Sequence, residues 1–280
     1  MRLTILAMVA GCGESSSVAC DDGTFCPDRT VCGGAGVCLV EADACARFDE
    51  NTACELDLER GRCVEGACVP GVELIGVAAV VPRREAIEGV EVTARDHPEI
   101  VPSLTNRNQF FGLKNIVPDT AVVLELSFPD TRSVVTGPIV LGDRGRSIDV
   151  VYGGIPLVAE ASLDLVAATT GLAQIPGTGI VSAAAFDPAI GAFAGMSAVL
   201  DVGCSGPFYL GAELLVVADA TATLATDGSF VFVNCPPGAA ALTAGFPGRS
   251  CRTLDGIPAT NLAIEIVADR LLWLGRITCE

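Results

Sequence analysis

Cysteine supplies most of the side chains in this sequence that could do chemistry, with thirteen cysteines among 280 residues. One of them, Cys12, ends a short apolar run at the N-terminus. The other twelve are an even number, so we predict that they form disulfides in an oxidising compartment. These twelve are Cys20, Cys26, Cys32, Cys38, Cys45, Cys54, Cys63, Cys68, Cys204, Cys235, Cys251 and Cys279.

Eight of the twelve lie between Cys20 and Cys68, in two groups of four. Each group has a glycine two residues before its last cysteine, at Gly36 and Gly66. The segment 20–70 has too few apolar residues to build a core, so we expect cross-links to provide its order. The pairing stays open, because eight cysteines allow about 105 connectivities.

Two metal-binding alternatives apply to the same segment. Clustered cysteines can bind zinc, but this cluster contains no CxxC pair of the kind found in zinc ribbons. Carboxylates can bind calcium, but the acidic residues here lack the EF-hand spacing, and we expect them to be solvated. They are Asp21, Asp22, Asp43, Asp49 and Glu50. We therefore expect disulfides and no metal or other cofactor, with calcium binding left open.

The first eleven residues, 1–11, combine a positive charge at Arg2 with an apolar run from Leu3 to Val9 and small residues before Cys12. Secretory signal peptides have this organisation. A valine three residues before the cysteine resembles the lipobox of bacterial lipoproteins. The resemblance implies that the Cys12 thiol carries a diacylglycerol, that residues 1–11 are removed, and that the new amine is acylated. The alternative is an unlipidated secreted protein whose signal is cut nearby.

Residues 12–19 form a polar tether after the signal. Gly13 occupies the position where an aspartate commonly retains lipoproteins at the inner membrane. The resemblance therefore implies a lipid anchor in the outer membrane, on its periplasmic or its surface-exposed side. The most apolar later run, Pro188 to Leu200, has 13 residues and is too short to span a bilayer.

The chain is strongly acidic, with 34 acidic and 17 basic residues and a formal net charge of −17. Such a charge disfavours the phosphate backbone of nucleic acids and anionic lipid surfaces as partners.

From residue 71 onward, short stretches of alternating apolar and polar residues are separated by glycine and proline. The alternation is clear in 89–94, 122–128 and 148–152. A period of two is typical of strands with one buried face. Many such strands separated by turns predict an all-β fold of antiparallel sandwiches.

The strand and turn pattern occurs twice. The first copy consists of Asn106–Phe111 followed by Asn115–Asp119. The second copy consists of Asp227–Phe230 followed by Asn234–Gly238. In both, a phenylalanine lies four residues before an asparagine that opens a proline turn. We infer that one structural unit is repeated in the chain.

This repeat predicts one β-sandwich at 71–153 and a second at 176–280. The segment between them, 154–175, is expected to be a linker. Within it, Pro156–Thr170 has spaced leucines and valines and is followed by Gly171. That combination is typical of a short helix with a glycine after its end.

The second copy carries Asp227-Gly228-Ser229-Phe230 and then Pro236-Pro237-Gly238 before another strand. This order is similar to that of carboxypeptidase regulatory-like domains, which are transthyretin-like (prealbumin-type) sandwiches grouped with the carbohydrate-binding-like folds. The first copy departs from the motif at 107–109 and at 117–119. The resemblance implies a structural or binding role without catalytic machinery. A lipobox, a cysteine-rich segment and such sandwiches together resemble cell-envelope lipoproteins of Gram-negative bacteria.

Few other residues suggest chemistry. The one histidine, His97, is the only candidate for the general base of a hydrolase. It is not accompanied by a Gly-x-Ser-x-Gly, HExxH or phosphate-binding glycine motif. Sugar-binding modules of this fold stack sugar rings on exposed aromatic side chains. The candidates are Trp273, which is flanked by leucines and expected in the core, and Tyr209, which is expected in a loop after Gly206-Pro207.

We therefore expect a non-enzymatic, lipid-anchored cell-envelope protein that serves as a structural, adhesion or binding module. A carbohydrate-binding module of the envelope is the alternative, and a hydrolase using His97 is a second alternative. The expected partners are the membrane, through the N-terminal lipid, and an envelope protein or a glycan. The four later cysteines should form two bridges in the second sandwich, with Cys204 or Cys251 bonded to Cys235.

Overall fold

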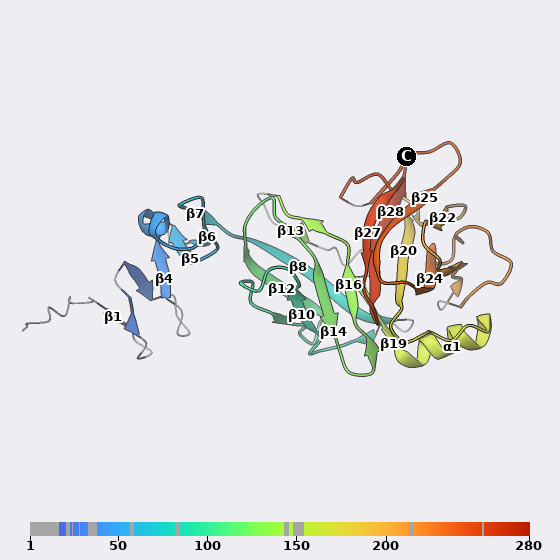
Figure 1. Ribbon diagram of the computed structural model, residues 1–280, viewed down its shortest axis with the longest axis horizontal. Helices are drawn as coiled ribbons and strands as arrows, with labels where there is room; N and C mark the ends of the chain where they lie inside the picture. Colours follow the sequence, from blue (N-terminus) through green and yellow to red (C-terminus); the bar gives the residue numbers. More distant parts are fainter. Residues whose placement is uncertain are drawn as a thin grey trace, which may run out of the picture. The chain divides into compact units, whose positions relative to one another are not determined.

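The computed structural model divides the chain into two compact units, one ending at Gly71 and the other spanning Val72–Glu280 (Figure 1). The described residues are 17–20, 23, 25–27, 29–32, 38–56, 59–81, 85–142, 146–147, 154–212, 215–253 and 255–280. The predicted signal peptide, Cys12 and the strand predicted at 148–152 lie outside them. Within these ranges, no helix has the length and apolar character needed to cross a bilayer.

The small unit is built from short strands and one 3-10 helix. Its elements are β1 (Val18–Ala19), β2 (Phe25–Cys26), β3 (Thr30–Cys32), β4 (Cys38–Glu41), η1 (Ala42–Arg47), β5 (Ala53–Leu56), β6 (Glu59–Val64) and β7 (Ala67–Pro70). β1 pairs with β2, and the other strands form one sheet in the order β3-β4-β5-β6-β7.

Four disulfides hold the small unit together in one repeated pattern. In each group of four, the first cysteine is bonded to the third and the second to the fourth. The bridges are Cys20–Cys32, Cys26–Cys38, Cys45–Cys63 and Cys54–Cys68. The buried cluster of this unit has six residues, and four of them are cysteines. The prediction of a cysteine-rich segment ordered by disulfides is therefore confirmed.

The large unit contains the other strands and one α-helix. Its first elements are β8 (Val72–Val81), β9 (Glu85–Ala86), β10 (Glu91–Ala94), β11 (Ser103–Leu104), β12 (Phe110–Ile116), β13 (Ala121–Val122), β14 (Leu124–Ser127), β15 (Thr131–Arg132), β16 (Val134–Thr136), β17 (Ile139–Val140), β18 (Arg146–Ser147) and β19 (Ile155–Ala159). Then follow α1 (Glu160–Thr170), β20 (Gly179–Asp187), β21 (Gly191–Ala192), β22 (Ser197–Leu200), β23 (Ser205–Tyr209), β24 (Ser229–Cys235), β25 (Gly238–Gly245), β26 (Cys251–Thr253), β27 (Leu262–Ile266) and β28 (Leu271–Cys279).

Each half of the large unit is a sandwich of two sheets. In the first half, β8 pairs antiparallel with β12 and parallel with β18 and β19, and this sheet packs against β11-β10-β14-β16. In the second half, β20 pairs antiparallel with β24 and parallel with β28, and this sheet packs against β22-β25-β27. The predicted all-β class, with two β-sandwiches after a disulfide-rich segment, is confirmed.

The alternation predicted in 89–94 and 122–128 gives half-buried strands. Val92 and Leu126 have no exposed surface, whereas Glu91, on the other face of β10, is exposed. The apolar residues at every second position thus form the core between the two sheets of the first half.

A buried threonine makes the same hydrogen bonds in both halves. Thr105 Oγ1 accepts from the Val90 N–H at 3.0 Å, and Thr223 Oγ1 accepts from the Met196 N–H at 3.0 Å. Each hydroxyl also donates to the backbone carbonyl three residues before that N–H, at 2.8 and 3.0 Å. Both threonines are 2% exposed. The repeat seen in the sequence therefore extends to the hydrogen bonds of the interior.

Left-handed backbone positions recur in the same way. Asn115 and Asn234, which open the two proline turns, have φ angles of 59° and 55°. Gly89 and Gly195, which precede β10 and β22, have φ angles of 88° and 99°. Glycine and asparagine tolerate this conformation better than other residues, which explains their presence at these positions.

The two halves share strands and form one unit. β16 pairs parallel with β28, with Val134 opposite Leu271, so that one ten-stranded sheet runs through both halves (Figure 1). Leu271 donates its N–H to the Ser133 carbonyl at 2.9 Å. Next to this pair, Arg270 Nε donates to Glu125 Oε1 at 2.9 Å.

The connection between the halves is a strand followed by a helix. The helix predicted from Pro156 begins instead at Glu160, because the residues before it belong to β19, which pairs with β8. Ile155 and Leu157 are buried, with 1% and 0% exposure, and Pro156 between them is only partly buried. This alternation has the period of a strand. α1 ends at Thr170, and Gly171 follows it as predicted, with a left-handed φ of 72°.

Candidate functional site

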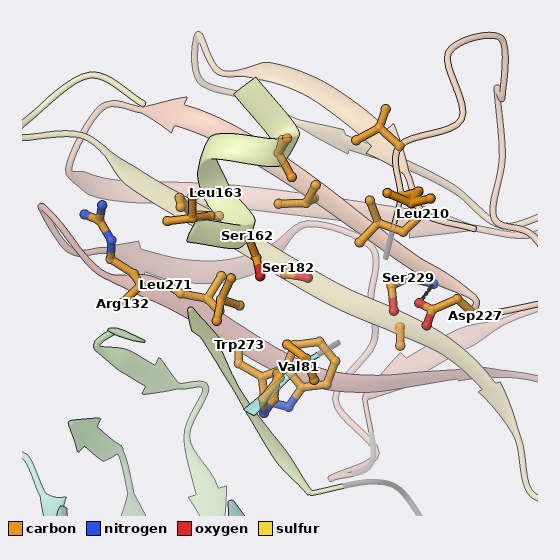
Figure 2. Close-up of a pocket in the computed structure, with 18 of the residues that line it drawn as sticks. Val81, Arg132, Ser162, Leu163, Ser182, Leu210, Asp227, Ser229, Leu271 and Trp273 are labelled. Atoms are coloured by element: carbon orange, nitrogen blue, oxygen red, sulfur yellow. Dashed lines mark hydrogen bonds between the residues drawn. The ribbon is translucent and has the colours of Figure 1, made fainter. Parts of the chain in front are cut away.

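A pocket lies between α1 and one face of the strands β20, β24 and β28 (Figure 2). The other face of these strands packs into the core of the second half. The cavity volume is about 400 Å³, within the range of about 300–1,000 Å³ found for ligand sites. Aliphatic side chains from α1, β19 and the segment after β23 line its walls. Among them are Pro156, Val158, Leu163, Val166, Leu210 and Leu215.

Strand register arranges the floor of the pocket in three rows. From one end to the other, the rows are Ile180 and Leu271; then Val231, Ser182 and Trp273; then Ser229, Ala184 and Arg276. The central strand β20 contributes the two small residues Ser182 and Ala184, which leave space above the sheet. The floor therefore changes from apolar to polar along the strands.

The polar end of the pocket carries a carboxylate, a hydroxyl and a guanidinium. Asp227 lies beside Ser229 at this end (Figure 2), and its Oδ1 accepts a hydrogen bond from the Ser229 N–H at 3.2 Å. The Arg276 guanidinium lies 3.9 Å from the centroid of the Phe186 ring, a cation–π arrangement. Groups of opposite charge thus line the same end of the pocket.

The apolar end is bordered by Arg132, whose charge is balanced by two acids. Its Nη2 donates to Glu160 Oε2 at 3.0 Å, and its Nη1 lies 4.0 Å from Asp269 Oδ1. The Arg132 side chain is 16% exposed. This end therefore presents no uncompensated positive charge to a ligand.

Hydrogen bonds hold α1 at both of its ends. At the start, the Glu160 N–H donates to the Asp130 carbonyl at 3.1 Å. Beyond the end, Asn234 Oδ1 accepts from the Ile175 N–H at 2.7 Å, and Asn234 Nδ2 donates to the Ala173 carbonyl at 3.1 Å. Hydrogen bonds thus connect the chain at both ends of α1 to other parts of the large unit.

The two aromatic candidates for sugar stacking lie in different environments. Trp273, expected in the core, is half-buried and lines the centre of the pocket. Tyr209 is 3% exposed, and its hydroxyl accepts from the Ala198 N–H at 3.2 Å. The loop position predicted for Tyr209 is wrong, because Ser205–Tyr209 forms β23 and pairs with β24. Its ring therefore belongs to the core and has no exposed face for stacking.

The environment of His97 does not support catalysis. His97 Nδ1 lies 3.1 Å from Glu99 Oε1, and Nε2 lies 3.3 Å from the Ala121 carbonyl oxygen. Both ring nitrogens therefore lie beside oxygen atoms that can accept hydrogen bonds. Neither contact involves a hydroxyl or thiol nucleophile.

All twelve cysteines after Cys12 are bonded in pairs. The second sandwich contains Cys204–Cys235, one of the two pairings suggested for Cys235, and Cys251–Cys279. Two groups of three sulfurs in the small unit lie close enough to share a metal ion. Their sulfurs belong to disulfides, which are not thiolate ligands, so the structure favours cross-links over zinc.

Calcium binding gains no geometric support within the described part of the chain, where no three carboxylates lie within ligating distance of one another. Glu50 Oε1 instead accepts a hydrogen bond from the Glu65 N–H at 2.9 Å. Asp21 and Asp22 lie outside the described residues.

The chain matches no protein-family model and no curated protein. Among solved structures, it is similar to the Bacillus anthracis TIE protein, with 10% identity over 75% of this chain and 34% of that chain and a TM-score of 0.25. It is also similar to GBS52, the minor pilin of Streptococcus agalactiae, with 10% identity over 75% of this chain and 96% of that chain and a TM-score of 0.23. A streptococcal ancillary pilin shows 13% identity over 90% of this chain and 74% of that chain, with a TM-score of 0.23.

This chain thus spans about one third of the length of the Bacillus anthracis protein that it matches. The TM-scores are 0.25 or lower, so we draw no conclusion about fold or function from these similarities.

Sequence reasoning missed the pocket, apart from Trp273. Five of the six residues from Ile180 to Ala185 are apolar, with no alternation between apolar and polar positions. Such a run is typical of a strand with both faces covered. The small residues on one of its faces are the signal that could have indicated a cavity. That signal becomes informative only when the elements opposite β20 are known.

Proposed function

We propose that this chain is a non-enzymatic, lipid-anchored cell-envelope protein whose large unit is a rigid structural, adhesion or binding module. The observation that carries this proposal is the pairing of all twelve cysteines after Cys12 in six disulfides. Such cross-linking is characteristic of exported proteins. The sheet shared by the two halves supports a rigid role, and the pocket supports a binding role.

The lipid anchor is proposed from the sequence. Residues 1–11 act as the signal, Cys12 carries the lipid, and residues 12–19 tether the body to the outer membrane. We further propose that both sandwiches, 71–153 and 176–280, are carboxypeptidase regulatory-like domains, with 154–175 connecting them. The threonine network and the left-handed asparagines, present in both halves, support a common origin of the two sandwiches.

Intact mass of the protein purified from membranes tests both parts of this proposal. We expect a chain that begins at Cys12 with three acyl groups. Reduction should add twelve hydrogens, because six bridges open. An unprocessed chain without acyl groups refutes the anchor, and a mass unchanged by reductant refutes the oxidised state.

A carbohydrate-binding module is the second candidate, and the position of Trp273 favours it. The indole lines a pocket that also contains hydroxyl and carboxylate groups, and sugars are bound by such combinations of aromatic and polar groups. A glycan array probed with the natural protein and with Trp273→Ala tests this candidate. A glycan signal that disappears in Trp273→Ala supports it, and the lack of signal for any glycan removes it.

A further inference from the structure

We propose that the pocket between α1 and the sheet binds an uncharged amphiphile, with an aliphatic chain at one end and a hydroxyl-bearing head at the other. This inference goes beyond the proposed function, because it assigns a site and a class of ligand. It does not depend on whether Cys12 carries a lipid.

The apolar part of the ligand is inferred from the first two rows of the floor and from the walls. Ile180 and Leu271 close the apolar end of the floor and are 2% and 3% exposed, so most of the apolar surface open to a ligand comes from half-buried wall residues such as Pro156, Val158 and Val166. Leu163 of α1 and Leu271 of β28 line the pocket together (Figure 2). An alkyl chain placed there gains contact with aliphatic side chains on several sides and loses contact with water.

The head group is inferred from the third row. Ser229 and the adjacent Asp227 offer a hydroxyl and a carboxylate on one side, and Arg276 lies at the other edge of the same row. Hydroxyl groups can donate to Asp227 and accept from Arg276, so a polyol can hydrogen-bond to both side chains.

Charge argues against an ionic head group. An anion is attracted by Arg276 but repelled by Asp227. A cation is attracted by Asp227 but repelled by Arg276. At the other end, Arg132 is already paired with Glu160 and Asp269. Desolvating an ion without a matching countercharge is costly, so an uncharged head is favoured.

Trp273 makes the binding directly measurable, because it is the only tryptophan in the chain and it lines the pocket. The test uses the full chain carrying Cys12→Ser, which can be purified without detergent. Its tryptophan emission is titrated with octyl glucoside, 1-monooctanoylglycerol, octanoate, octyltrimethylammonium and glucose. The four amphiphiles are kept below their critical micelle concentrations.

We expect both uncharged amphiphiles to shift the emission saturably. Octanoate and octyltrimethylammonium should bind at least about tenfold more weakly, as expected for a desolvated ion without a matching countercharge. Glucose should cause no shift. Of the two uncharged probes, tighter binding of the glucoside indicates a sugar head, and tighter binding of the glycerol ester indicates a glyceride head. Tightest binding of a charged probe overturns the proposal, as does a response to glucose alone.

Pocket-filling variants locate the binding. Ala184→Leu fills the floor and Val166→Phe fills the space under α1, and each should weaken octyl glucoside binding at least about tenfold by removing apolar contact area. Two variants are used so that one folded variant remains if the other fails to fold, which far-ultraviolet circular dichroism detects. Val199→Leu is the matched control, since Val199 is 61% exposed and does not line the pocket. Unchanged binding in both folded filling variants refutes the site.

The head-group contacts are tested separately. Ser229→Ala should weaken octyl glucoside binding by a factor of about two to ten, the range for one neutral hydrogen bond. Asp227→Asn keeps an oxygen that can accept from the Ser229 N–H but removes the negative charge, so it should strengthen octanoate binding relative to the natural residue. Equal effects of both variants on all probes contradict the assigned orientation of the ligand.

Discussion

Thr105 and Thr223 each hold, from a loop, the segment that precedes β10 or β22, and they do so with the same donors and acceptors. Each hydroxyl is buried and makes two hydrogen bonds to the backbone. A valine has the same shape but cannot make these bonds, so it leaves one N–H and one carbonyl without a partner in the interior.

We therefore expect Thr105→Val and Thr223→Val each to lower the free energy of unfolding by about 1–3 kcal/mol. Urea titration followed by circular dichroism measures the effect. Thr221→Val is the control, because Thr221 is exposed, and surface substitutions usually change stability by less than about 0.5 kcal/mol. Losses no larger than that of the control contradict a structural role for the hydroxyls.

Gly171 illustrates a position where the backbone alone selects the residue. A Cβ at Gly171 meets no atom within 4 Å, but the φ of 72° is unfavourable for other residues. Gly171→Ala should therefore lower the free energy of unfolding by about 1 kcal/mol, through strain alone. A Cβ at Gly203 also meets nothing within 4 Å, and no such φ restricts that position. Gly203→Ala should be neutral or slightly stabilising, and the opposite order of the two variants contradicts this explanation.

At the scale of elements, α1 is held both by packing and by hydrogen bonds near its ends. Leu163 and Val166 line the pocket, and Leu163 also packs against the buried cluster of the first half. Asn234 holds the chain just after the helix through two side-chain hydrogen bonds. One asparagine at the end of β24 thus holds the segment that follows the pocket roof.

We predict that Asn234→Gly loosens the segment that follows α1 without disturbing β24. Glycine accepts the φ of 55° but has no side chain to bind Ile175 and Ala173. Hydrogen exchange at the Ile175 amide should become faster, while amides in the centre of β24 remain protected. Asn115→Gly, the equivalent change in the first half, is the control and should leave Ile175 unaffected.

Local patterns in the sequence predicted several elements well. The period of two predicted β10 and β14, and the glycine after the last apolar residues predicted where α1 ends. The start of α1 was missed because Pro156 can begin a helix or lie in a strand. The pairing of β19 with β8 decides between them. Tyr209 was misplaced for a related reason, since the proline before it indicates a turn but here lies within an edge strand.

At the scale of the whole molecule, the pairing of β16 with β28 makes the two halves dependent on each other. Outer-face residues of the second half, among them Ile180 and Val231, belong to the buried cluster of the first half. The sequence did not predict this pairing, because strand partners far apart in the chain leave no local signal. The pocket has the same origin, since its floor comes from one half and β19 comes from the other.

We therefore expect the large unit to unfold in a single transition. Leu124→Ala removes a fully buried side chain of the first half and should lower the free energy of unfolding by about 2–5 kcal/mol. Hydrogen exchange at the Phe232 amide, in the core of the second half, should report the same loss of free energy. Unchanged exchange at Phe232, while circular dichroism shows an earlier transition, indicates that the halves unfold independently.

The interlaced bridges of the small unit have a consequence for proteolysis. Every peptide bond between Cys20 and Cys38 is spanned by at least one disulfide, and the same holds between Cys45 and Cys68. A protease that cuts once within either stretch produces two fragments that remain covalently attached. Between Cys20 and Cys68, only the connection from Cys38 to Cys45 lacks this protection, so a single cut there severs the first group of four cysteines from the rest of the chain.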